Sequence, residues 1–474
     1  MKKRIVVIGG GITGLSAAHR LTELSNEKNL DLDVALLEKT GVLGGVISTI
    51  ERDGFLIEEG PDSFITTKPW ALNLSNRLGL AGEIIETNDE KRRTFVLLDG
   101  KLAPLPEGFI MLAPTRIYPF LTTPLFSWKG KARMLMDLFI ARRQQSDESL
   151  ASFVRRRLGR EALERVAQPM ISGVYTADPE KLSLRATMPQ FLEMEERYGS
   201  VIKGMYHSYK KRGEGVKRES GARYSLFLSY REGMRTLVDA LGKSLPDGSV
   251  RLNQTVNSLR PVEGGWEVST EETVYQASGV VLATPSFAAA RLLKAFDEPC
   301  ASLLSDIEYA SSAVVILAYK KEDLSNYAHG FGFVVPTIER SGLIACSFSS
   351  EKFSGRAPEG YIVLRAFVGG AINPEKLLLS DSEMIDMVER ELGVILGINS
   401  RPLFTIVRRY PDAMPQYLVG HLELLDRIKE ELAKHRGLEI AGNAYEGIGI
   451  PDCVNSGERA AERVLETIQR DSGL

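Results

Sequence analysis

The stretch RIVVIGGGITG, residues 4–14, decides the fold class. Residues 4–8 have the apolar, β-branched character of a buried parallel strand, and the glycines after them predict a tight turn. A helix is expected from about Gly14 to Leu24, and a second strand, LDVALLEK, carries Glu38 near its end, 24 residues after Gly14. This order predicts a βαβ unit with a GxGxxG fingerprint and a terminal acid.

The fingerprint has a physical reading. Glycine lets the backbone approach a pyrophosphate closely, and the free N–H groups of a helix N-terminus favour an anion there. Glu38 would accept hydrogen bonds from the ribose hydroxyls of an adenosine. An isolated GxGxxG would be weak evidence, and a glycine turn in another kind of α/β domain is the alternative. The strand, the helix and the acid around it favour a dinucleotide.

Two further turns follow the second strand. Gly44 and Gly45 are paired in KTGVLGGVIST, and Gly60, Pro61, Asp62 and Ser63 close the run DGFLIEEGPDSF. A loop that passes closely over a dinucleotide with a bulky tail needs such glycines, whereas a simple NAD domain does not. The alternative for the glycine pair is an ordinary hairpin turn.

Composition excludes several classes of function. The chain has 474 residues, 43% of them apolar, and a formal net charge of −3, which gives no reason to expect nucleic acid as a partner. Its three cysteines are scattered, which predicts neither a disulfide framework nor a metal pair and suits a reducing cytoplasm. Five histidines without ligand spacing give no reason to expect a metal.

Membrane insertion is not expected, but contact with a membrane surface is an open alternative. The N-terminal apolar run is interrupted by glycine after about five residues, as in a strand and unlike a signal peptide. The most apolar segment, Gly108 to Phe126, contains an arginine and three prolines and cannot serve as a span. It is expected either to pack normally or to rest on a bilayer from the cytoplasmic side.

The rest of the chain predicts a discontinuous organisation. Residues 128–170 have helical spacing, with Arg155, Arg156 and Arg157 expected on a solvated helix face, and residues 207–225 resemble a mobile basic loop. The sheet is expected to be entered near the start, again in 226–292, and at the C-terminal end, with strand-rich sequence between the last two. The expected domains are a FAD-binding domain (1–66, 226–292, 405–474), a β-rich substrate domain (67–107, 176–225, 293–404) and a helical subdomain (108–175).

The C-terminal run LEIAGNAYEGIGIPDC, residues 438–453, contains Gly442, Gly447 and Gly449 before a helix expected to begin near Pro451 or Asp452. One glycine would suffice for a helix cap. If the ligand is FAD, this helix would point its positive end at the edge of the flavin ring that becomes anionic on reduction, and the glycines would let backbone N–H groups reach the ring.

These motifs, with GVYTADPEKLS, ATP, GFGFVVP and FVGG, resemble the protoporphyrinogen/coproporphyrinogen oxidases of haem synthesis, within the flavin amine oxidase-like superfamily. The runs MPQYLVGH (residues 414–421) and EGIGIPDC are similar to the Gram-positive branch, which oxidises coproporphyrinogen III. The resemblance covers essentially the whole chain. It implies the α/β amine oxidase-like (p-hydroxybenzoate hydroxylase-like) fold, FAD, removal of six electrons from a porphyrinogen, and reoxidation by O₂ to H₂O₂. The sequence leaves the oligomeric state open and gives a transient hand-over to a chelatase as a further expectation.

The resemblance also assigns residues. The expected FAD contacts are Gly9, Gly10, Gly11, Ile12, Thr13, Gly14, Glu38, Lys39, Gly44, Gly45, Val46, Gly60, Pro61, Asp62, Ser63, Val256, Tyr410, Gly442, Ile448, Gly449 and Ile450. Many relatives have a basic residue where this chain has Val46. The expected substrate positions are Gly173, Tyr175, Val334, Ser347 and Phe367, with Lys68, Arg92 and Arg93 as candidate cations for the propionates. Catalytic side chains are not expected, because the flavin carries the chemistry.

Two other classes of function share these motifs. A flavin amine oxidase or carotenoid-type desaturase would use the same fold, and Tyr410 with Tyr445 could form part of the aromatic cage of an amine oxidase. A non-catalytic FAD-binding scaffold or haem carrier would bind a flavin that the substrate does not reduce.

Overall fold

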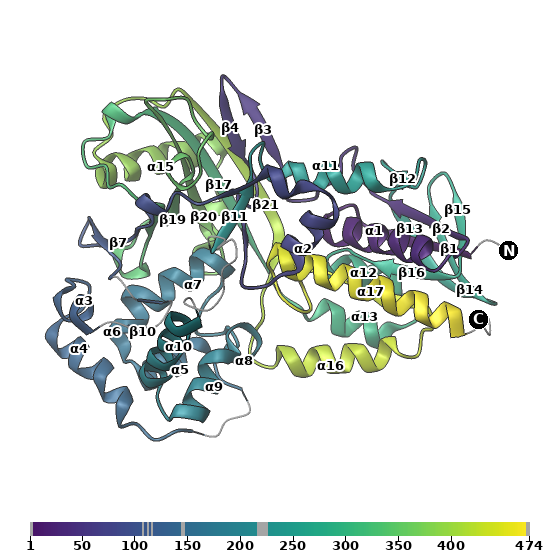
Figure 1. The fold of residues 1–474 in the computed structure, drawn as a ribbon, viewed down its shortest axis with the longest axis horizontal. Helices are drawn as coiled ribbons and strands as arrows, with labels where there is room; N and C mark the ends of the chain where they lie inside the picture. Colours follow the sequence, from purple (N-terminus) through teal and green to yellow (C-terminus); the bar gives the residue numbers. More distant parts are fainter. Residues whose placement is uncertain are drawn as a thin grey trace. The chain divides into compact units, whose positions relative to one another are not determined.

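The computed structural model describes residues 3–106, 109–110, 113–114, 117–143, 147–215 and 226–470. The chain forms two compact units, whose elements Figure 1 labels. Unit 1 comprises Met1–Glu86, Tyr224–Glu308 and Leu422–Leu474, and unit 2 comprises Thr87–Arg223 and Tyr309–His421. The boundaries differ from the expected ones: 67–86 and 293–308 belong to unit 1, 405–421 belongs to unit 2, and the described part of 108–175 is not a separate unit.

Unit 1 is built on a parallel sheet of five strands in the order β12–β2–β1–β16–β22. Their bounds are Val250–Arg251, Leu32–Leu37, Lys3–Ile8, Gly279–Leu282 and Leu438–Ile440. The strands come from the three parts of the chain predicted to enter the sheet, which confirms that prediction. Ile5, Val7, Leu36 and Val281 are fully buried, as expected for a parallel sheet covered on both faces.

Helices α1 (Ile12–Glu27) and α17 (Ile450–Arg470) pack side by side in unit 1 (Figure 1). They run parallel, because Arg20 pairs with Glu462 further along both helices than the contact of Thr13 with Gly457. A Cβ at Gly457 would stand 2.2 Å from the carbonyl oxygen of Thr13. The two helix N-termini therefore lie at the same end of the pair. Both helices begin slightly earlier than predicted, within the usual uncertainty of helix ends.

Unit 1 also contains smaller antiparallel elements. These are the hairpin β3–β4, a three-stranded sheet in the order β5–β11–β6, and a meander β13–β14–β15. Their bounds are β3 Thr49–Arg52, β4 Phe55–Glu58, β5 Phe64–Ile65, β11 Phe227–Tyr230, β6 Ile84–Glu86, β13 Val256–Val262, β14 Gly265–Thr270 and β15 Val274–Ala277. Further helices are α2 Trp70–Arg77, α11 Arg235–Ser244, α12 Ser286–Leu293, α13 Glu298–Ser305 and α16 His421–Leu432.

Unit 2 contains a seven-stranded sheet in the order β21–β17–β20–β19–β18–β7–β8. The bounds are Phe404–Pro415, Tyr309–Lys320, Tyr361–Gly369, Leu343–Phe348, Gly332–Val334, Thr94–Leu98 and Lys101–Pro104. All pairs are antiparallel except β18 with β7. Helix α15 (Asp381–Leu396) covers one face, where Met384 and Val388 join Leu364 and Ala366 in the core.

The other part of unit 2 is helical, as predicted for 128–170. Its helices are α3 Ile117–Thr122, α4 Trp128–Leu135, α5 Leu150–Arg157, α6 Arg160–Ala162, α7 Gln168–Tyr175, α8 Leu184–Thr187, α9 Pro189–Tyr198 and α10 Val201–Gly215. The predicted loop over 207–225 is wrong for 207–215, which belong to α10, and 216–225 lie outside the described residues.

The apolar stretch from Gly108 to Phe126 is only partly described. It contains the short strands β9 (Phe109–Ile110) and β10 (Ala113–Pro114), while 108, 111–112 and 115–116 lie outside the described residues. Phe120, Leu125 and Phe126 are buried, whereas Tyr118 is 79% exposed. In the part of the chain that the structure describes, no helix is long and apolar enough to cross a membrane.

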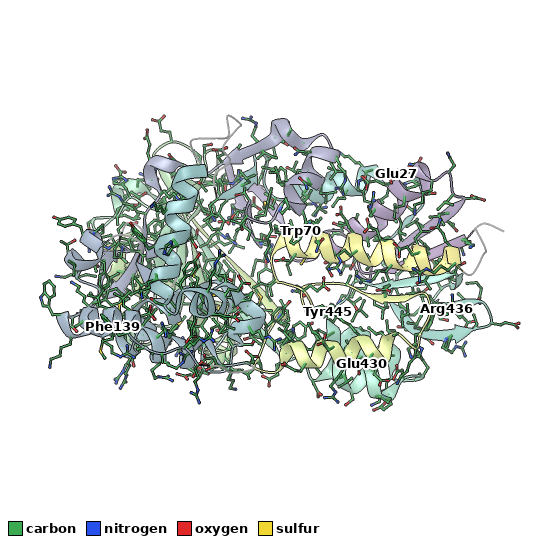
Figure 2. All side chains as sticks on the ribbon, turned by 60° about the horizontal axis from the view of Figure 1, so that its bottom comes forward. Glu27, Trp70, Phe139, Glu430, Arg436 and Tyr445 are labelled. Carbon is green, nitrogen blue, oxygen red and sulfur yellow. The ribbon has the colours of Figure 1, made fainter. Side chains whose placement is uncertain are left out.

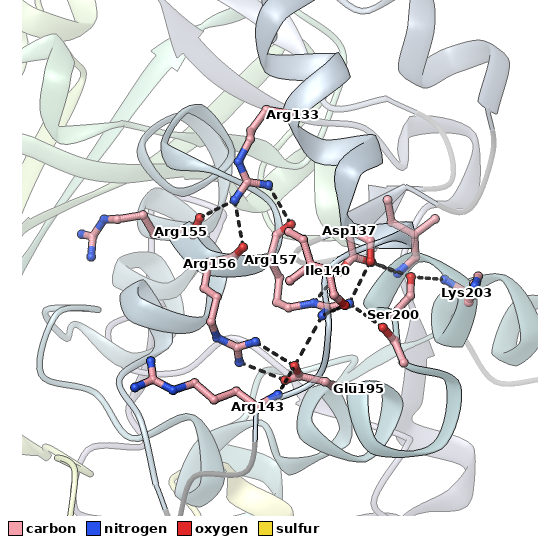
Figure 3. A network of polar contacts seen from close by, with 12 residues as sticks. Arg133, Asp137, Ile140, Arg143, Arg155, Arg156, Arg157, Glu195, Ser200 and Lys203 are labelled. Carbon is pink, nitrogen blue, oxygen red and sulfur yellow. Dashed lines mark hydrogen bonds and ion pairs between the residues drawn. The ribbon is translucent and has the colours of Figure 1, made fainter.

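The three consecutive arginines of α5 do not form the solvated face predicted from sequence. Arg155 is half exposed, but the side chain of Arg157 is fully buried and bonds to Asp137 and to the carbonyl oxygens of Ile140 and Gly199 (Figure 3). Asp137 in turn accepts hydrogen bonds from Ser200 and from the backbone of residue 202. The network ties the segment after α4 to α5 and to the junction of α9 with α10.

We predict that Arg157→Met destabilises unit 2 by about 3–5 kcal/mol, because it leaves the buried carboxylate of Asp137 without its cation. The shift in urea unfolding followed by circular dichroism measures the loss. Arg155→Met removes a neighbouring arginine whose pair with Glu180 is exposed, and it should cost no more than about 0.5 kcal/mol. Equal effects of the two substitutions would contradict the role assigned to the buried network.

A second charged cluster joins three helices of unit 1. Glu23 of α1 contacts His19 at 3.2 Å, Arg20 at 3.2 Å and Arg77 of α2 at 3.0 Å. Arg77 also pairs with Glu458 of α17. Burial alone would raise the pKa of Glu23, but the contacts with His19, Arg77 and Arg20 outweigh burial and lower that pKa to about 2. The Glu23 carboxylate therefore stabilises the packing of α1 against its neighbours.

The lowered pKa predicts a dependence of stability on pH. A carboxyl whose pKa falls on folding contributes stability above its unfolded pKa of roughly 4.3, and that contribution is lost as the pH falls toward about 2. Glu23→Gln should therefore lower the free energy of unfolding at pH 7 by on the order of 1 kcal/mol, and by about half as much at pH 3. A difference from the parent protein that is the same at both pH values would argue against an ionised Glu23.

Candidate active site

The glycine-rich turn between β1 and α1 forms an open cradle. A Cβ at Gly14 would stand 1.9 Å from the carbonyl oxygen of Gly9, so Gly14 is required by the protein itself. Gly11 differs: its φ is −72°, which any residue adopts, and a Cβ there would meet no atom within 4 Å. Gly11 caps α1 without any side-chain hydrogen bond, so the first N–H groups of the helix face this space. Such a site suits an anion.

Glu38 closes one side of the cradle. Its Oε2 accepts a hydrogen bond of 2.6 Å from the backbone N–H of Gly10, and its Oε1 accepts from the backbone and hydroxyl of Thr40. Gly44 lies beside the glycine-rich turn, because its N–H donates to the carbonyl of Gly10 at 2.8 Å. The carboxylate thus holds the turn in place, and lone pairs are left over for the ribose hydroxyls predicted for it.

The second glycine pair brings the GPDS turn to the same region. Val46 is 47% exposed, and a Cβ at Gly60 would stand 1.7 Å from its carbonyl oxygen. Asp62 accepts hydrogen bonds from Ser63 and, at its carbonyl, from Ser229 of β11. The exposed Lys39 follows Glu38, and Val256 begins β13 two residues after Gln254, whose N–H donates to the carbonyl of Glu38.

Thr284 is a cradle residue to which the sequence analysis gave no role. Its hydroxyl oxygen is buried and has no hydrogen-bond partner among the described residues. The residue stands beside the cradle, because a Cβ at Gly9 would meet the Thr284 methyl group at 3.5 Å. A buried hydroxyl without a partner is costly, so a polar ligand in the cradle would satisfy it. The ATP motif was the sequence signal that could have identified it.

The C-terminal loop leads from β22 to α17. The N–H of Gly442 donates to Ser456 of α17 at 3.1 Å, and Tyr445, labelled in Figure 2, is buried. Ile448 and Gly449 are half-buried directly before the helix. Burial raises the pKa of the Cys453 thiol to about 12, so the nearest thiol is neutral at ordinary pH.

The predicted cofactor residues thus belong to unit 1, with the exception of Tyr410 in β21 of unit 2. The predicted substrate residues belong to unit 2, with the exception of Lys68. Lys68 of unit 1 is not a free cation, since its Nζ lies 2.6 Å from a carboxylate oxygen of Asp452.

Two predicted substrate residues, Val334 and Phe367, lie on one face of the sheet of unit 2, and a third, Gly173, lies over that face. Val334 of β18 pairs with Ala345 of β19, and Ala345 pairs with Phe367 of β20. Partners in register point to the same face, here the face opposite the α15 core. Gly173 of α7 lies over them, because a Cβ there would be 3.6 Å from Val334 and 3.9 Å from Ala345. The sequence did not identify Ala345, because only its neighbours in the folded sheet place it at this site.

Ser347 and Arg365 extend this face at a polar end. They are register partners on β19 and β20, two residues from Ala345 and Phe367 respectively, so they point to the same side. The buried guanidinium of Arg365 lies 5.4 Å from the centre of the Phe367 ring. The Ser347 hydroxyl donates to the carbonyl of Phe331 at 3.5 Å, and the Phe331 N–H donates to the carbonyl of Arg93. The exposed Arg92 and Arg93 therefore adjoin the same end of the face.

Two glutamines hold α7 in position. Gln168 accepts hydrogen bonds from the N–H and hydroxyl of Thr337, the residue directly after the GFGFVVP motif. Gln416 of the MPQYLVGH motif donates to the carbonyl of Tyr175 at 3.4 Å, while the hydroxyl of Tyr175 donates to the carbonyl of Thr187. The motif quoted from sequence thus has a positioning role toward the end of α7.

The parallel sheet, the open glycine cradle and the acid after β2 define a dinucleotide-binding protein of the oxidoreductase type. The chain belongs to the family of flavin containing amine oxidoreductases, whose model matches residues 12–465. The resemblance found from the motifs is thereby confirmed, and with it a flavin cofactor.

Several relatives are similar over their whole length. Coproporphyrinogen III oxidase of Bacillus subtilis (strain 168) is 37% identical over 98% of both chains, and that of Staphylococcus aureus is 33% identical over 98% of this chain and 99% of the other. Chloroplastic protoporphyrinogen oxidase of Nicotiana tabacum is 32% identical over 98% of this chain and 86% of its own.

Solved structures share the fold. A protein of Exiguobacterium sp. 255-15, provisionally described as a protoporphyrinogen oxidase, superimposes with a TM-score of 0.86 at 32% identity, covering 98% of this chain and 99% of the other. Reduced UDP-galactopyranose mutase shares the fold alone, with a TM-score of 0.73 at 17% identity over 99% and 98% of the two chains.

Gly11 offers a test of the cradle. We predict that Gly11→Val leaves the apoprotein folded but weakens flavin binding at least tenfold, because the new side chain occupies the space above the helix N-terminus. Flavin titration followed by quenching of its fluorescence measures affinity, and apoprotein melting measures folding. Gly82→Val, where a Cβ also meets no atom within 4 Å, is the matched control and should bind normally. Normal binding by both variants would place the nucleotide elsewhere.

Proposed function

We propose that this chain binds FAD and oxidises coproporphyrinogen III to coproporphyrin III in haem biosynthesis. The observation that carries the proposal is the similarity, over 98% of this chain, to coproporphyrinogen III oxidases of Bacillus subtilis and Staphylococcus aureus. The cradle in unit 1 supports it, because Gly11 leaves space for a pyrophosphate and the buried Thr284 hydroxyl has no hydrogen-bond partner in the described part of the chain. The bulky nucleotide predicted from Gly44 and Gly45 favours FAD over a smaller flavin.

The overall reaction removes six electrons and six protons from the macrocycle, in three two-electron oxidations. We propose O₂ as the acceptor, so that three molecules of O₂ become three of H₂O₂. When bound, the flavin supplies hydride acceptance from a carbon of the substrate. The chain does not need a catalytic base for the pyrrole N–H protons, which can be lost to water.

The residues of the chain bind and orient the reactants. In unit 1, the first N–H groups of α1 would hold the pyrophosphate, Glu38 the ribose, and the loop before α17 the polar edge of the flavin ring. In unit 2, Val334, Ala345 and Phe367 form an apolar wall that suits the flat face of a tetrapyrrole. Gly173 of α7 lies over part of that wall without adding a side chain to it.

The polar end of the wall would select the more carboxylated substrate. Coproporphyrinogen carries four propionates, and arginine pairs well with carboxylates. Arg92 and Arg93 are exposed directly before β7, which pairs with β18, and β18 pairs with the strand that holds Ser347. Lys68, the third candidate cation, is engaged with Asp452 and is the weakest of the three for this role.

We predict that the FAD-loaded protein oxidises coproporphyrinogen III faster than protoporphyrinogen IX. Porphyrin fluorescence and released peroxide, each corrected for autoxidation, measure the two rates in parallel. The double variant Arg92→Ala/Arg93→Ala should raise KM for coproporphyrinogen about three- to tenfold, as expected for loss of one or two charge-assisted bonds at an exposed site. Arg142→Ala, an exposed arginine elsewhere in unit 2, should leave KM unchanged.

The outcomes separate the alternatives. Faster oxidation of protoporphyrinogen would keep the reaction and overturn the choice of substrate. If neither porphyrinogen is oxidised while the protein retains its flavin, the function is that of an amine oxidase or of a non-catalytic flavin-binding protein. Amine substrates that reduce the bound flavin would then distinguish between these two.

Contact with a membrane surface, and hand-over of the product to a chelatase, remain proposals. Exposed apolar side chains support the former: Trp128 of α4 is 73% exposed, and Phe139 (labelled in Figure 2) is 87% exposed. Such side chains suit the interfacial region of a bilayer. Co-sedimentation with anionic liposomes that is no greater than for a Trp128→Ser/Phe139→Ser variant would exclude this contact.

A further inference from the structure

Asp452 occupies an unusual place at the start of α17. It is the third residue of the helix, and its side chain is only 6% exposed. The carboxylate folds back over the preceding loop, since a Cβ at Gly447 would stand 2.4 Å from its Cγ and a Cβ at Gly449 would stand 3.2 Å from its Oδ2. Gly447 has a φ of +128°, which side chains rarely adopt. The loop conformation and the buried acid therefore require each other.

Lys68 brings a positive charge to the same place from another part of unit 1. It follows β5, and its Nζ lies 2.6 Å from Oδ1 of Asp452, while 41% of its side chain remains exposed. A carboxylate in the first turn of a helix is already stabilised by the helix dipole. Lys68 pairs with this acid and adds a positive charge beside the helix N-terminus.

The charges at the start of α17 can be added to find the sign of the local electric field. A helix N-terminus is equivalent to roughly +0.5 of an elementary charge. Asp452 alone would turn this into a net negative charge of about −0.5, and the cation of Lys68 restores the positive sign. Both the ion pair and the loop 447–450 lie within unit 1, so their arrangement belongs to a single compact body. The sign of the field at this loop is therefore set by Lys68.

We propose that the Lys68–Asp452 ion pair sets the reduction potential of the flavin. The inference rests on the proposed function, in which the loop 447–450 faces the ring edge that becomes negative on reduction. A positive local field stabilises the reduced, anionic form, so Lys68 raises the potential and Asp452 limits the rise. Lys68 thus acts as a positioning residue for charge at the cofactor, a role different from the propionate contact expected from sequence.

A charge series tests this proposal without any porphyrinogen. The potential of the bound flavin is measured by anaerobic redox titration against reference dyes. Lys68→Met should lower the equilibrium constant for two-electron reduction about tenfold, a shift of about 30 mV to more negative potential. Asp452→Asn should shift it in the opposite direction, the double variant should return close to the parent value, and Lys68→Arg should preserve it. Lys243→Met, which removes an exposed lysine of α11 in the same unit, is the control and should not change it.

The failures can be told apart. An unchanged potential in Lys68→Met overturns the proposal, and so does a raised KM for coproporphyrinogen without a shift in potential, which would return Lys68 to the substrate. If Asp452→Asn does not fold, the flavin potentials of Lys68→Met and Lys68→Arg still test the proposal. The two variants differ in charge at a half-exposed position. A parent protein that binds no flavin would overturn the proposed function and this inference together, whereas a shifted potential without porphyrinogen oxidation would overturn only the former.

Discussion

Backbone contacts that admit no side chain determine how unit 1 is built. The carbonyl oxygen of Gly9 lies where a Cβ at Gly14 would be, and the carbonyl oxygen of Thr13 lies where a Cβ at Gly457 would be. The first contact fixes the direction in which α1 leaves β1, and the second fixes α17 against α1. Because the two helices are parallel, both present free N–H groups at the same end. The positive field for a large, partly anionic ligand is therefore a consequence of close packing.

Each of these two helix ends has an acid beside it, Glu38 or Asp452. The two acids differ in burial and in their partners. Glu38 satisfies the N–H of Gly10 and pairs with no cation in the described part of the chain. Asp452 is more deeply buried and is paired with Lys68. In the proposed function the pyrophosphate of the nucleotide lies at the first end, and because its charge does not change during turnover it needs no paired cation there. The flavin ring that we propose at the second end changes its charge during turnover, and the Lys68–Asp452 pair would set the electric field there.

The sequence predicted the features that depend on local pattern. The strand before Gly9, the acid after β2 and the three returns to the parallel sheet follow from periodicity and glycine placement, and the structure confirms them. Arg157 was misjudged because its partners Asp137 and Gly199 are distant in sequence, and a run of arginines alone does not show which one faces inward. The contact of Lys68 with Asp452 could not be predicted for the same reason, since the two residues are 384 positions apart. Ala345 became visible only through strand register.

The wall in unit 2 has a direction, and this bears on the choice of substrate. Along β19, Ala345 lies in the apolar part between Val334 and Phe367, while Ser347 lies at the end with Arg365, joined through Phe331 to the backbone of Arg93. A flat apolar macrocycle would gain the same binding free energy from the wall in every rotation about its own axis. Carboxylates at its rim break that equivalence, because burying a charge away from cations is costly. The same strands that make the wall apolar would thus also orient a carboxylated tetrapyrrole on it, as the proposed function requires.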